Sequence, residues 1–501
     1  MKRNGENLQS CAHNFKQNPM RYPGLETRFQ RRRFIQNVAG LSGSILLQNW
    51  RAFGEVSQWR EIRVFTTSET RKHAEGPPLR WKSTKGVSPT TSDAVEITST
   101  QRFQPMLGFG CAYTDASCFL LSRMDAAMRQ GFLTETFSPD RMGLNVGRTT
   151  IGASDYSRNV YSYDDVANDV SMEHFSIAHD EEYILPMLRE MRRLNPELFL
   201  LSTPWSPPGW MKTYGSMLGG WMTSRYLEPY SRYFGRFLDA YKAAGVEINA
   251  VTSQNEVETD QAGHMPATYW TPEMESDFIR EYLGPLLRKK KSKTEIWLLD
   301  HNYELWKRVR WQLQDPELRQ YVAGVAWHGY VGTPDQMSRL HEVVPEMPFY
   351  WTEGGPDITD PKYALDWTRW GTVFTSAIKN WCRCIITWNL MLDERGEPNI
   401  GPFSCGGLVT LRGGRELEYS GQYWALRHLS QHVKRGAVRL GSHSDASELS
   451  HVAMENRDGS SVLMLTNTGD ERELQMIMPV PQGRVTADVR LDRNSISTVI
   501  W

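Results

Sequence analysis

Cysteine is scarce in this chain, with six residues among 501. They stand at positions 11, 111, 118, 382, 384 and 405, so loss of an N-terminal signal would leave five. An odd number argues against a complete disulfide framework, and no Cys-x-x-Cys pair is present. The sequence therefore excludes a small disulfide-stabilised scaffold. Its length favours one large domain with a smaller one beside it.

Long apolar runs and a net charge are also lacking. No apolar run reaches the roughly 18 to 20 residues that a membrane-spanning helix needs, so we predict no transmembrane segment. Lys and Arg total 57 against 58 Asp and Glu, which leaves a formal charge of −1. This balance gives no overall attraction to nucleic acid, and we expect no nucleic-acid partner.

Common catalytic signatures are missing too. The chain contains no His-Glu-x-x-His, no Gly-x-Ser-x-Gly and no phosphate-binding loop that ends in Gly-Lys-Ser or Gly-Lys-Thr. The run Gly108-Phe109-Gly110 lacks the third glycine of a dinucleotide-binding loop. Zinc, serine-hydrolase and nucleotide chemistry thus have no sequence support, and we predict no metal and no organic cofactor.

The first part of the chain contains an export-like motif. Arg31, Arg32 and Arg33 precede Phe34 and a weakly apolar stretch through Leu47. This pattern is typical of a twin-arginine signal, so we assign residues 1–54 to an export signal and N-terminal extension. A periplasmic or extracellular location follows. The alternative interpretation is the start of an ordinary basic amphipathic helix.

From about residue 105 the chain alternates short apolar runs with longer segments of helical period. The apolar runs predict eight strands, at residues 106–111, 145–151, 198–203, 248–253, 295–300, 324–327, 348–352 and 384–388. Apolar residues three and four apart predict amphipathic helices at 180–194, 231–244, 274–289, 303–318 and 364–379, with Gly245 as a C-terminal cap. Eight strand–helix units favour an α/β fold, a closed (β/α)8 TIM barrel over residues 105–422, rather than an open α/β sheet.

The two ends of the chain have a different pattern. Within residues 423–501, short strand-like runs at 461–465, 474–478 and 485–491 are bounded by Gly, Asn, Asp and Pro. Within residues 55–104, segments 61–67 and 94–98 are strand-like as well. We therefore predict that both ends pair into one β-sandwich beside the barrel.

Polar residues that follow the predicted strands are the candidates for chemistry, because active sites of such barrels form where the strands end. Gln254-Asn255-Glu256 follows the fourth strand and Glu353-Gly354-Gly355 follows the seventh. Two carboxyl groups on one face are what a retaining glycosidase needs, one as acid/base and one as nucleophile. Taken singly, each glutamate is as easily a structural ion-pair partner.

Aromatic and polar side chains surround these positions in the sequence. Trp205 and Trp388 end the third and eighth strands, and sugar rings stack on such flat side chains. Sugar hydroxyls need polar partners, for which the candidates after strands two, four and six are Asp155, Asn255, His328 and Tyr330. For any one tryptophan core packing is the alternative, and for His328 a satisfied buried histidine is equally good.

The motifs in order resemble glycoside hydrolase family 30, which includes the glucosylceramidases. The similarity runs over residues 103–500 and includes RTTIGASDYS at 148–157, STPWSPPGWMKT at 202–213, Asn255-Glu256, and Trp327-His328-Gly329-Tyr330. It continues through Thr352-Glu353-Gly354 and Thr387-Trp388-Asn389. One departure is Val257, where many relatives have proline after the acid/base glutamate.

The resemblance implies roles for the candidate residues. Glu256 would be the acid/base, kept protonated by less polar surroundings, and Glu353 the nucleophile, kept ionised by Arg148 or a tyrosine. Asp155, Trp205, Asn255, Tyr330 and Trp388 would contact the sugar, with Arg148 and His328 supporting the carboxylates.

The resemblance also sets the expected substrate. We expect a carbohydrate or glycolipid, cleaved at a β-glucosidic bond in a glucosylceramidase-like or β-1,6-glucanase-like manner. The alternatives are a β-xylosidase, β-fucosidase or xylanase of the same family, and a carbohydrate-binding relative without activity.

Overall fold

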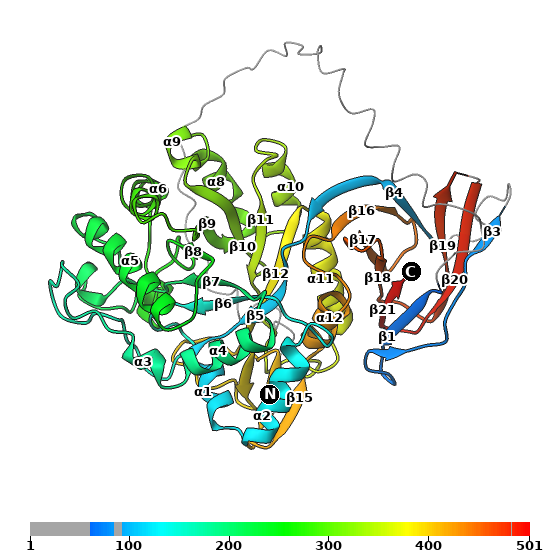
Figure 1. Cartoon of the computed structure of the whole chain (residues 1–501), viewed down its shortest axis with the longest axis horizontal. Helices are drawn as coiled ribbons and strands as arrows, with labels where there is room; N and C mark the ends of the chain where they lie inside the picture. The colour runs from blue at the N-terminus through cyan, green and yellow to red at the C-terminus, as the bar shows by residue number, and fades with distance from the viewer. Residues whose placement is uncertain (1–60, 85–92, 482) are drawn as a thin grey trace, which may run out of the picture.

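The computed structural model describes residues 61–84, 93–481 and 483–501, and the export-like motif at 31–47 lies outside them. Eight parallel strands form a closed barrel, and helices surround it (Figure 1). The barrel strands are β5 (Gly108–Ala112), β6 (Val146–Thr150), β7 (Phe199–Thr203), β8 (Ala250–Thr252), β9 (Glu295–Asn302), β10 (Val322–His328), β11 (Phe349–Glu353) and β12 (Cys382–Asn389). All eight predicted strands are confirmed, and the open-sheet alternative is wrong.

The helices that cover the barrel follow the predicted segments, with breaks. They are α1 (Asp115–Arg123), α2 (Ala126–Phe137), α3 (Ala178–Glu181), α4 (Ile184–Leu194), α5 (Leu227–Ala243), α6 (Pro272–Asp277), η6 (Phe278–Leu283), α7 (Gly284–Lys289), α8 (Trp306–Gln312), α9 (Pro316–Arg319), α10 (Asp335–His341), α11 (Trp367–Lys379) and α12 (Gly421–Ser430). The predicted helix at 303–318 is split because Asp315 caps a new helix that begins at Pro316. Gly245 follows α5 with φ of +82°, as expected of a C-terminal cap.

Side chains inside the barrel change from apolar to polar along each strand. Inward positions repeat every second residue, so Val146 and Arg148 of β6 point to the same interior. The lower layer is apolar and aromatic, with Trp297 stacked on Tyr350 at a centroid distance of 3.8 Å. The upper layer carries Arg148 and the threonines of the neighbouring strands. The apolar floor therefore supports a polar site at the carboxyl ends of the strands.

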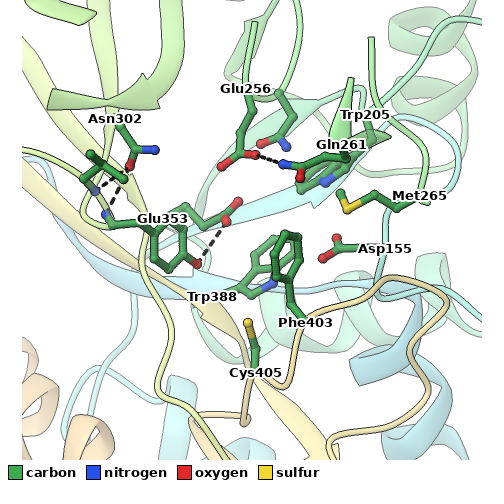
Figure 2. A pocket seen from close by; sticks show the side chains of 13 residues that line it. Asp155, Trp205, Glu256, Gln261, Met265, Asn302, Glu353, Trp388, Phe403 and Cys405 are labelled. Atoms are coloured by element: carbon green, nitrogen blue, oxygen red, sulfur yellow. Dashed lines mark hydrogen bonds between the residues drawn. The ribbon is translucent and has the colours of Figure 1, made fainter. Parts of the chain in front are cut away.

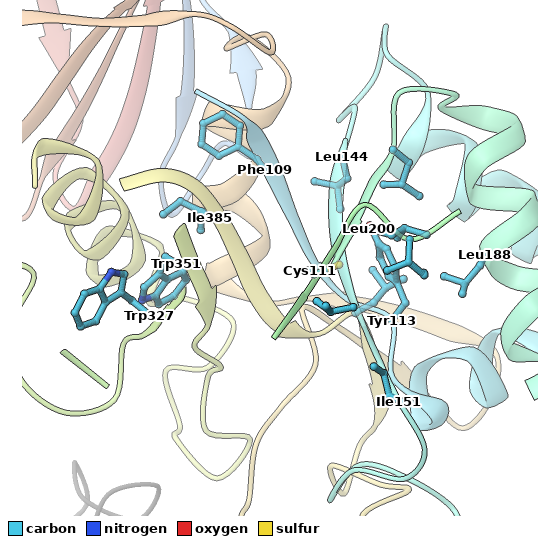
Figure 3. Close-up of a cluster of buried hydrophobic side chains, with 14 of the residues drawn as sticks. Phe109, Cys111, Tyr113, Leu144, Ile151, Leu188, Leu200, Trp327, Trp351 and Ile385 are labelled. Carbon is cyan, nitrogen blue, oxygen red and sulfur yellow. The ribbon is translucent and has the colours of Figure 1, made fainter. Parts of the chain in front are cut away.

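A second apolar layer lies between the strands and the surrounding helices. Figure 3 shows part of this core, in which Phe109, Leu200, Trp327 and Trp351 point away from the barrel axis. Trp351 is 1 % exposed, and the Cβ of any residue larger than glycine at position 354 would lie 2.3 Å from its ring. The tryptophan thus fixes the backbone just after Glu353.

Strands β13 (Met391–Asp393), β14 (Val409–Arg412) and β15 (Glu416–Tyr419) form a small separate sheet, and ten further strands build the predicted sandwich from both ends of the chain. They are β1 (Arg63–Thr67), β2 (Ala74–Glu75), β3 (Lys82–Thr84), β4 (Ala94–Pro105), β16 (Val438–His443), β17 (Leu449–Glu455), β18 (Ser461–Asn467), β19 (Arg472–Val480), β20 (Gly483–Leu491) and β21 (Ser495–Ile500). Strand β1 pairs with β21, and β4 lies between β16 and β19. The register of β4 on β16 shifts at Leu440. This irregularity lets the single strand β4 pair with both β16 and β19.

The sandwich is docked on α11 and α12. Trp367 of α11 donates from Nε1 to the carbonyl oxygen of Asn494 at 2.8 Å, and buried His428 of α12 lies between Thr67 and Thr498. Helix α12 differs from the all-β pattern predicted for the tail, because Ser420 caps it and Leu426 and Leu429 pack inward. None of the helices in the described part of the chain has the length and hydrophobicity to span a bilayer.

Candidate active site

A pocket opens at the carboxyl ends of the barrel strands (Figure 2). Both candidate glutamates line it, from β11 and from the loop after β8. The other lining residues are Asp155, Trp205, Asn255, Gln261, Met265, Asn302, Tyr330, Val331, Trp388, Phe403 and Cys405. All the residues predicted to contact a sugar therefore meet in one place.

Glu353 is the last residue of β11 and is 6 % exposed. Arg148, fully buried on β6, donates from Nη1 to one carboxylate oxygen of Glu353. The Tyr330 hydroxyl donates to the other oxygen at 3.0 Å. One donor from strand β6 and one from the loop after β10 thus hold this carboxylate in one orientation.

Glu256 is held by an irregular backbone. Its φ is +51°, a left-handed conformation that is uncommon for a residue with a side chain, and its N–H donates to the carbonyl oxygen of Asp300 at 2.9 Å. Gln261 donates to one carboxylate oxygen at 2.8 Å, and Nδ1 of His328 lies 3.3 Å from the other. The loop therefore turns this glutamate back over the barrel.

Asp300 is a central residue that the sequence analysis did not select. It is fully buried, and its carboxylate accepts from Arg148 Nη2 at 2.8 Å and from the hydroxyls of three barrel threonines, Thr203, Thr252 and Thr352, at 3.0, 2.8 and 2.7 Å. His328 Nε2 lies 3.1 Å from it. Beneath the pocket, Asp300 thus contacts both Arg148, which holds Glu353, and His328, which faces Glu256.

A bulge in β9 directs Asp300 into the barrel. Leu299 and Asp300 have φ of +79° and +51°, and the register of β10 on β9 skips one residue here. The Leu299 N–H donates to Glu275 at 3.1 Å instead of to a neighbouring strand. Glu275 therefore supports the bulge from α6, outside the barrel.

Glu275 is itself part of a buried ion pair. Arg308 of α8 donates from Nη2 to Glu275 at 2.8 Å, and both side chains are at most 1 % exposed. Ser253 also donates to Glu275 at 2.9 Å, and Arg308 Nη1 contacts Glu258 at 2.9 Å. The pair thereby links the bulge to the segment that carries Glu256.

His328 connects the carboxyl groups electrostatically. Burial alone would lower its pKa, but Glu353, Asp300 and Glu256 together raise it to about 9. Asp300 remains ionised, with a pKa well below its ordinary value, because Arg148 and His328 outweigh the effect of burial. His328 is therefore the group that holds a proton between the two glutamates at neutral pH.

The charge states of the glutamates differ from the expectation of an apolar environment around Glu256. Burial would raise the pKa of Glu256, but His301 and His328 lower it to about 2. Burial raises the pKa of Glu353 above its ordinary value, although His328 and Arg148 oppose this. Two imidazoles face Glu256 and favour its ionised form, whereas the sequence led us to expect less polar surroundings that keep it protonated.

The aromatic residues form one wall of the pocket. Trp205 and Trp388 stack with a centroid distance of 5.1 Å and an interplanar angle of 19°. The Arg148 guanidinium lies 4.6 Å from the Trp205 ring centroid, a cation–π distance, and Arg148 Nη2 donates to Asn255 at 2.6 Å. Arg148 thus orders both the wall and the carboxylates.

Asp155 lies beside this wall and points into the pocket (Figure 2). It is 5 % exposed, and its Oδ1 has no hydrogen-bond partner among the described residues. Burial raises the pKa of Asp155 well above its ordinary value, and Glu353 and Glu256 add to this effect. A buried carboxyl oxygen without a partner is suited to bind a ligand hydroxyl.

Several lining residues were missed by the sequence analysis. Asn302 accepts from the backbone N–H groups of Tyr330 and Val331 at 3.1 Å each, and so orients the tyrosine. His301 and Asn302 directly follow the predicted fifth strand, so the strand-end rule should have selected them. Gln261, Met265, Phe403 and Cys405 come from loops. No periodic pattern marks them.

One group in the pocket has the composition of a metal site. The possible ligand atoms of Glu256, His301 and His328 all lie within 4.8 Å of one another. The same atoms serve the proton network, since His328 Nε2 already contacts Asp300. A bound cation would therefore compete with the proton at this place.

The fold and the pocket define a class: a TIM-barrel hydrolase with two carboxyl groups and an aromatic wall at the strand ends. The model of the glycosyl hydrolase family 30 TIM-barrel domain matches residues 106–433, and that of the family 30 β-sandwich domain matches residues 436–499. The chain belongs to glycoside hydrolase family 30 and is a glycosidase.

Similar proteins cover most of the chain. An endo-1,6-β-D-glucanase of Neurospora crassa is 30% identical over 441 residues, 84% of this chain and 90% of that protein. The lysosomal acid glucosylceramidase of Mus musculus is 27% identical over 395 residues, 74% of this chain and 76% of that protein. Among solved structures, the endo-β1,6-glucanase BT3312 has 28% identity and a TM-score of 0.79, covering 88% of this chain and 100% of that one.

Proposed function

We propose that the protein hydrolyses β-glucosidic bonds with retention of configuration, with Glu353 as the nucleophile and Glu256 as the acid/base. The observation that carries this is the placement of two carboxyl groups, buried Glu353 and partly buried Glu256, against one pocket, with the imidazole of His328 in contact with both. Relatives named as glucosylceramidases and endo-1,6-β-glucanases make glucose the favoured glycone.

In the first step the Glu353 carboxylate attacks the anomeric carbon while the glycosidic carbon–oxygen bond breaks. The departing oxygen takes a proton from Glu256, which draws it from His328 through the 3.3 Å contact. A covalent glucosyl-enzyme remains. Arg148 and Tyr330 hold the attacking carboxylate on line, and Asp155 binds a hydroxyl of the glucose.

In the second step a water molecule attacks the anomeric carbon and releases Glu353. The Glu256 carboxylate accepts the proton of that water and returns it to the shared position with His328. Against the effect of burial, His301 and His328 lower the pKa of Glu256, so its carboxylate is ionised at neutral pH and able to accept this proton, and departure of the leaving group supplies the space for water.

The anomeric configuration of the first product tests this function. Purified protein is incubated with 4-nitrophenyl β-glucoside and with β-1,6-glucan oligomers, and the product is followed by proton NMR. Initial release of the β-anomer supports double displacement. Release of the α-anomer would overturn the role of Glu353, and activity on β-xylosides alone would favour the alternative glycone.

Residues 31–47 further lead us to propose export of the protein. Expression with and without residues 1–54, followed by fractionation of cells, tests this proposal. Retention of the full chain in the cytoplasm contradicts it.

A further inference from the structure

Exposed aromatic side chains gather on a loop next to the pocket. Between β7 and α5, Tyr214 is 76 % exposed, Trp221 39 % and Leu218 36 %. Large apolar side chains in such a group mark a contact surface more often than scattered ones do. The proton network and the sugar wall described above use none of them.

Two of these rings, Tyr214 and Trp221, together with the half-buried ring of Tyr269 from the loop after β8, are called the aromatic platform here. The Trp221 and Tyr269 centroids are 4.2 Å apart with an interplanar angle of 38°. Gly220, at φ of +82°, directly precedes Trp221, and a Cβ at its position would lie 2.9 Å from the Tyr214 ring. A side chain at position 220 would therefore displace the Tyr214 ring.

The platform is tied firmly to the pocket. The N–H of Tyr269 donates to Gly220 at 2.9 Å, and the N–H of Gly219 donates to Met265 at 3.3 Å. Buried Lys212 donates from Nζ to the carbonyl oxygens of Met217 and Ala267 at 2.8 and 2.6 Å. The loops after β7 and β8 therefore behave as one unit.

The position of the platform relative to Glu256 indicates what it binds. The loop after β8 begins with Glu256, contributes Gln261 and Met265 to the pocket, and then reaches Tyr269. Tyr269 lies four positions after Met265, so their Cα atoms are within about 14 Å. Because the acid/base protonates the departing oxygen, the leaving group lies along this loop.

We propose that the aromatic platform binds a sugar residue on the leaving-group side, which makes a β-linked glucan chain the substrate rather than a glycolipid. This rests on the proposed hydrolysis of β-glucosides. Flat rings with polar edges suit the apolar face of a sugar ring. The exposed positions of this loop, Ala262, Gly263 and His264, lie between Gln261 and Met265, and the segment 266–268 that leads to Tyr269 is buried, so the loop offers no continuous apolar path for two hydrocarbon tails.

The test compares substrates of increasing length in matched variants. Wild type, Trp221→Ala and Trp221→Phe are assayed on 4-nitrophenyl β-glucoside, on β-1,6-linked glucose oligomers of two to six units, and on glucosylceramide in detergent micelles. Trp311→Ala is the control, because Trp311 of α8 is 44 % exposed, belongs to neither loop and does not line the pocket.

We expect kcat/KM of wild type to rise with oligomer length. Trp221→Ala should lower the ratio of kcat/KM between the longest oligomer and the aryl glucoside about tenfold, mainly through KM, with partial recovery in Trp221→Phe. Trp311→Ala should keep the wild-type ratio. An equal loss on all substrates, or a loss confined to glucosylceramide, would overturn the proposal.

A binding measurement separates this proposal from the proposed function. Calorimetric titration of the Glu353→Gln protein, with and without Trp221→Ala, uses the same oligomers and needs no turnover. Tighter binding of longer oligomers that disappears with Trp221→Ala supports the platform even if no β-glucoside is hydrolysed. Affinity that is independent of length in the Glu353→Gln protein overturns the platform, whatever the hydrolysis assay shows.

Discussion

Glu353 and Glu256 face the same pocket from two kinds of backbone. Glu353 ends barrel strand β11, and Arg148 and Tyr330 hold its two oxygens. Glu256 has left-handed φ on a loop, and its partners are Gln261 and the imidazole of His328. In the proposed mechanism, the residue that attacks the anomeric carbon is therefore the one that the barrel holds in a fixed orientation. The residue proposed to gain and lose a proton lies beside a titratable side chain.

The largest effect is expected from substitution of Glu353, the glutamate at the end of a barrel strand. Glu353→Ala should lower kcat at least about 10⁴-fold, because the covalent path is lost. Added azide should restore part of the turnover and yield the α-glucosyl azide, identified by NMR. The matched control is Glu346→Ala, an exposed glutamate before β11, which should keep wild-type activity. Unchanged activity in Glu353→Ala contradicts the assignment.

Glu256→Gln should have a smaller effect that depends on the leaving group. General acid catalysis contributes about 10² to 10⁴-fold, so hydrolysis of a glucose disaccharide should fall by that factor. A 2,4-dinitrophenyl glucoside, which needs no proton to depart, should form the covalent intermediate at close to the wild-type rate. Burst kinetics measure both steps. Equal loss on both substrates would argue against the acid role.

The third prediction concerns Glu275, which supports the β9 bulge next to the loop that carries Glu256. Glu275→Gln removes the charge that pairs with Arg308 and turns one acceptor oxygen into an NH2 donor. If that donor takes the place of Oε1, it faces the Leu299 N–H and the Ser253 hydroxyl, so the β9 bulge loses its anchor. Breaking such a buried pair costs about 3 to 5 kcal/mol, and Tm should fall. Below the new Tm, kcat should decrease about 10 to 100-fold with little change in KM.

The control for that variant is Glu273→Gln on the same helix, where the side chain is exposed. It should change neither Tm nor kcat. A drop in Tm with kcat intact in Glu275→Gln would limit the ion pair to stability.

The dependence of Tm and kcat/KM on pH tests the protonation of His328, which contacts both glutamates. The folded pKa of His328, about 9, lies above its unfolded value, so its stabilisation is complete below about pH 6.5 and is lost as pH rises through 9. Tm and kcat/KM should therefore both decline on the alkaline side near pH 9. In Asp300→Asn the decline in kcat/KM should begin at lower pH. Profiles between pH 4 and 10 measure this, and an unmoved alkaline limb in Asp300→Asn contradicts it.

The smallest effect is expected from metal removal. Dialysis against EDTA should leave kcat unchanged, because the two-carboxylate mechanism needs no cation. Millimolar Zn²⁺ should instead inhibit, since Glu256, His301 and His328 form a possible binding group. An activity lost on EDTA treatment and restored by a divalent ion would contradict the proposed mechanism.

The fold and most of the pocket could be predicted from sequence because they follow periodic patterns. Strand ends recur at regular places, so Glu256, Glu353, Asn255 and Trp388 were found by position, and motif similarity added Arg148. Asp300 was not, because a one-residue bulge decides whether it points inward. The bulge depends on Glu275, which belongs to a different helix, and no local pattern in the sequence reports that contact.

The proton state of Glu256 also could not be predicted. Its pKa is set by His301 and His328 from two other strands, and the sequence gives neither their distance nor their burial. Loop residues such as Phe403 reach the pocket through backbone turns, and their positions depend on tertiary packing.

The sandwich has a consequence for how the chain acquires its structure during synthesis. Arg63 of β1 pairs with Ile500 of β21, and Val95 of β4 pairs with Met476 of β19. At about 5 to 20 residues per second, β1 waits roughly 20 to 90 seconds on the ribosome before its partner strand exists. The barrel, whose strands pair with neighbours in sequence except at its closure, is available to fold earlier. The edge of β1 that pairs with β21 thus stays unpaired until residues 495–500 have been synthesised.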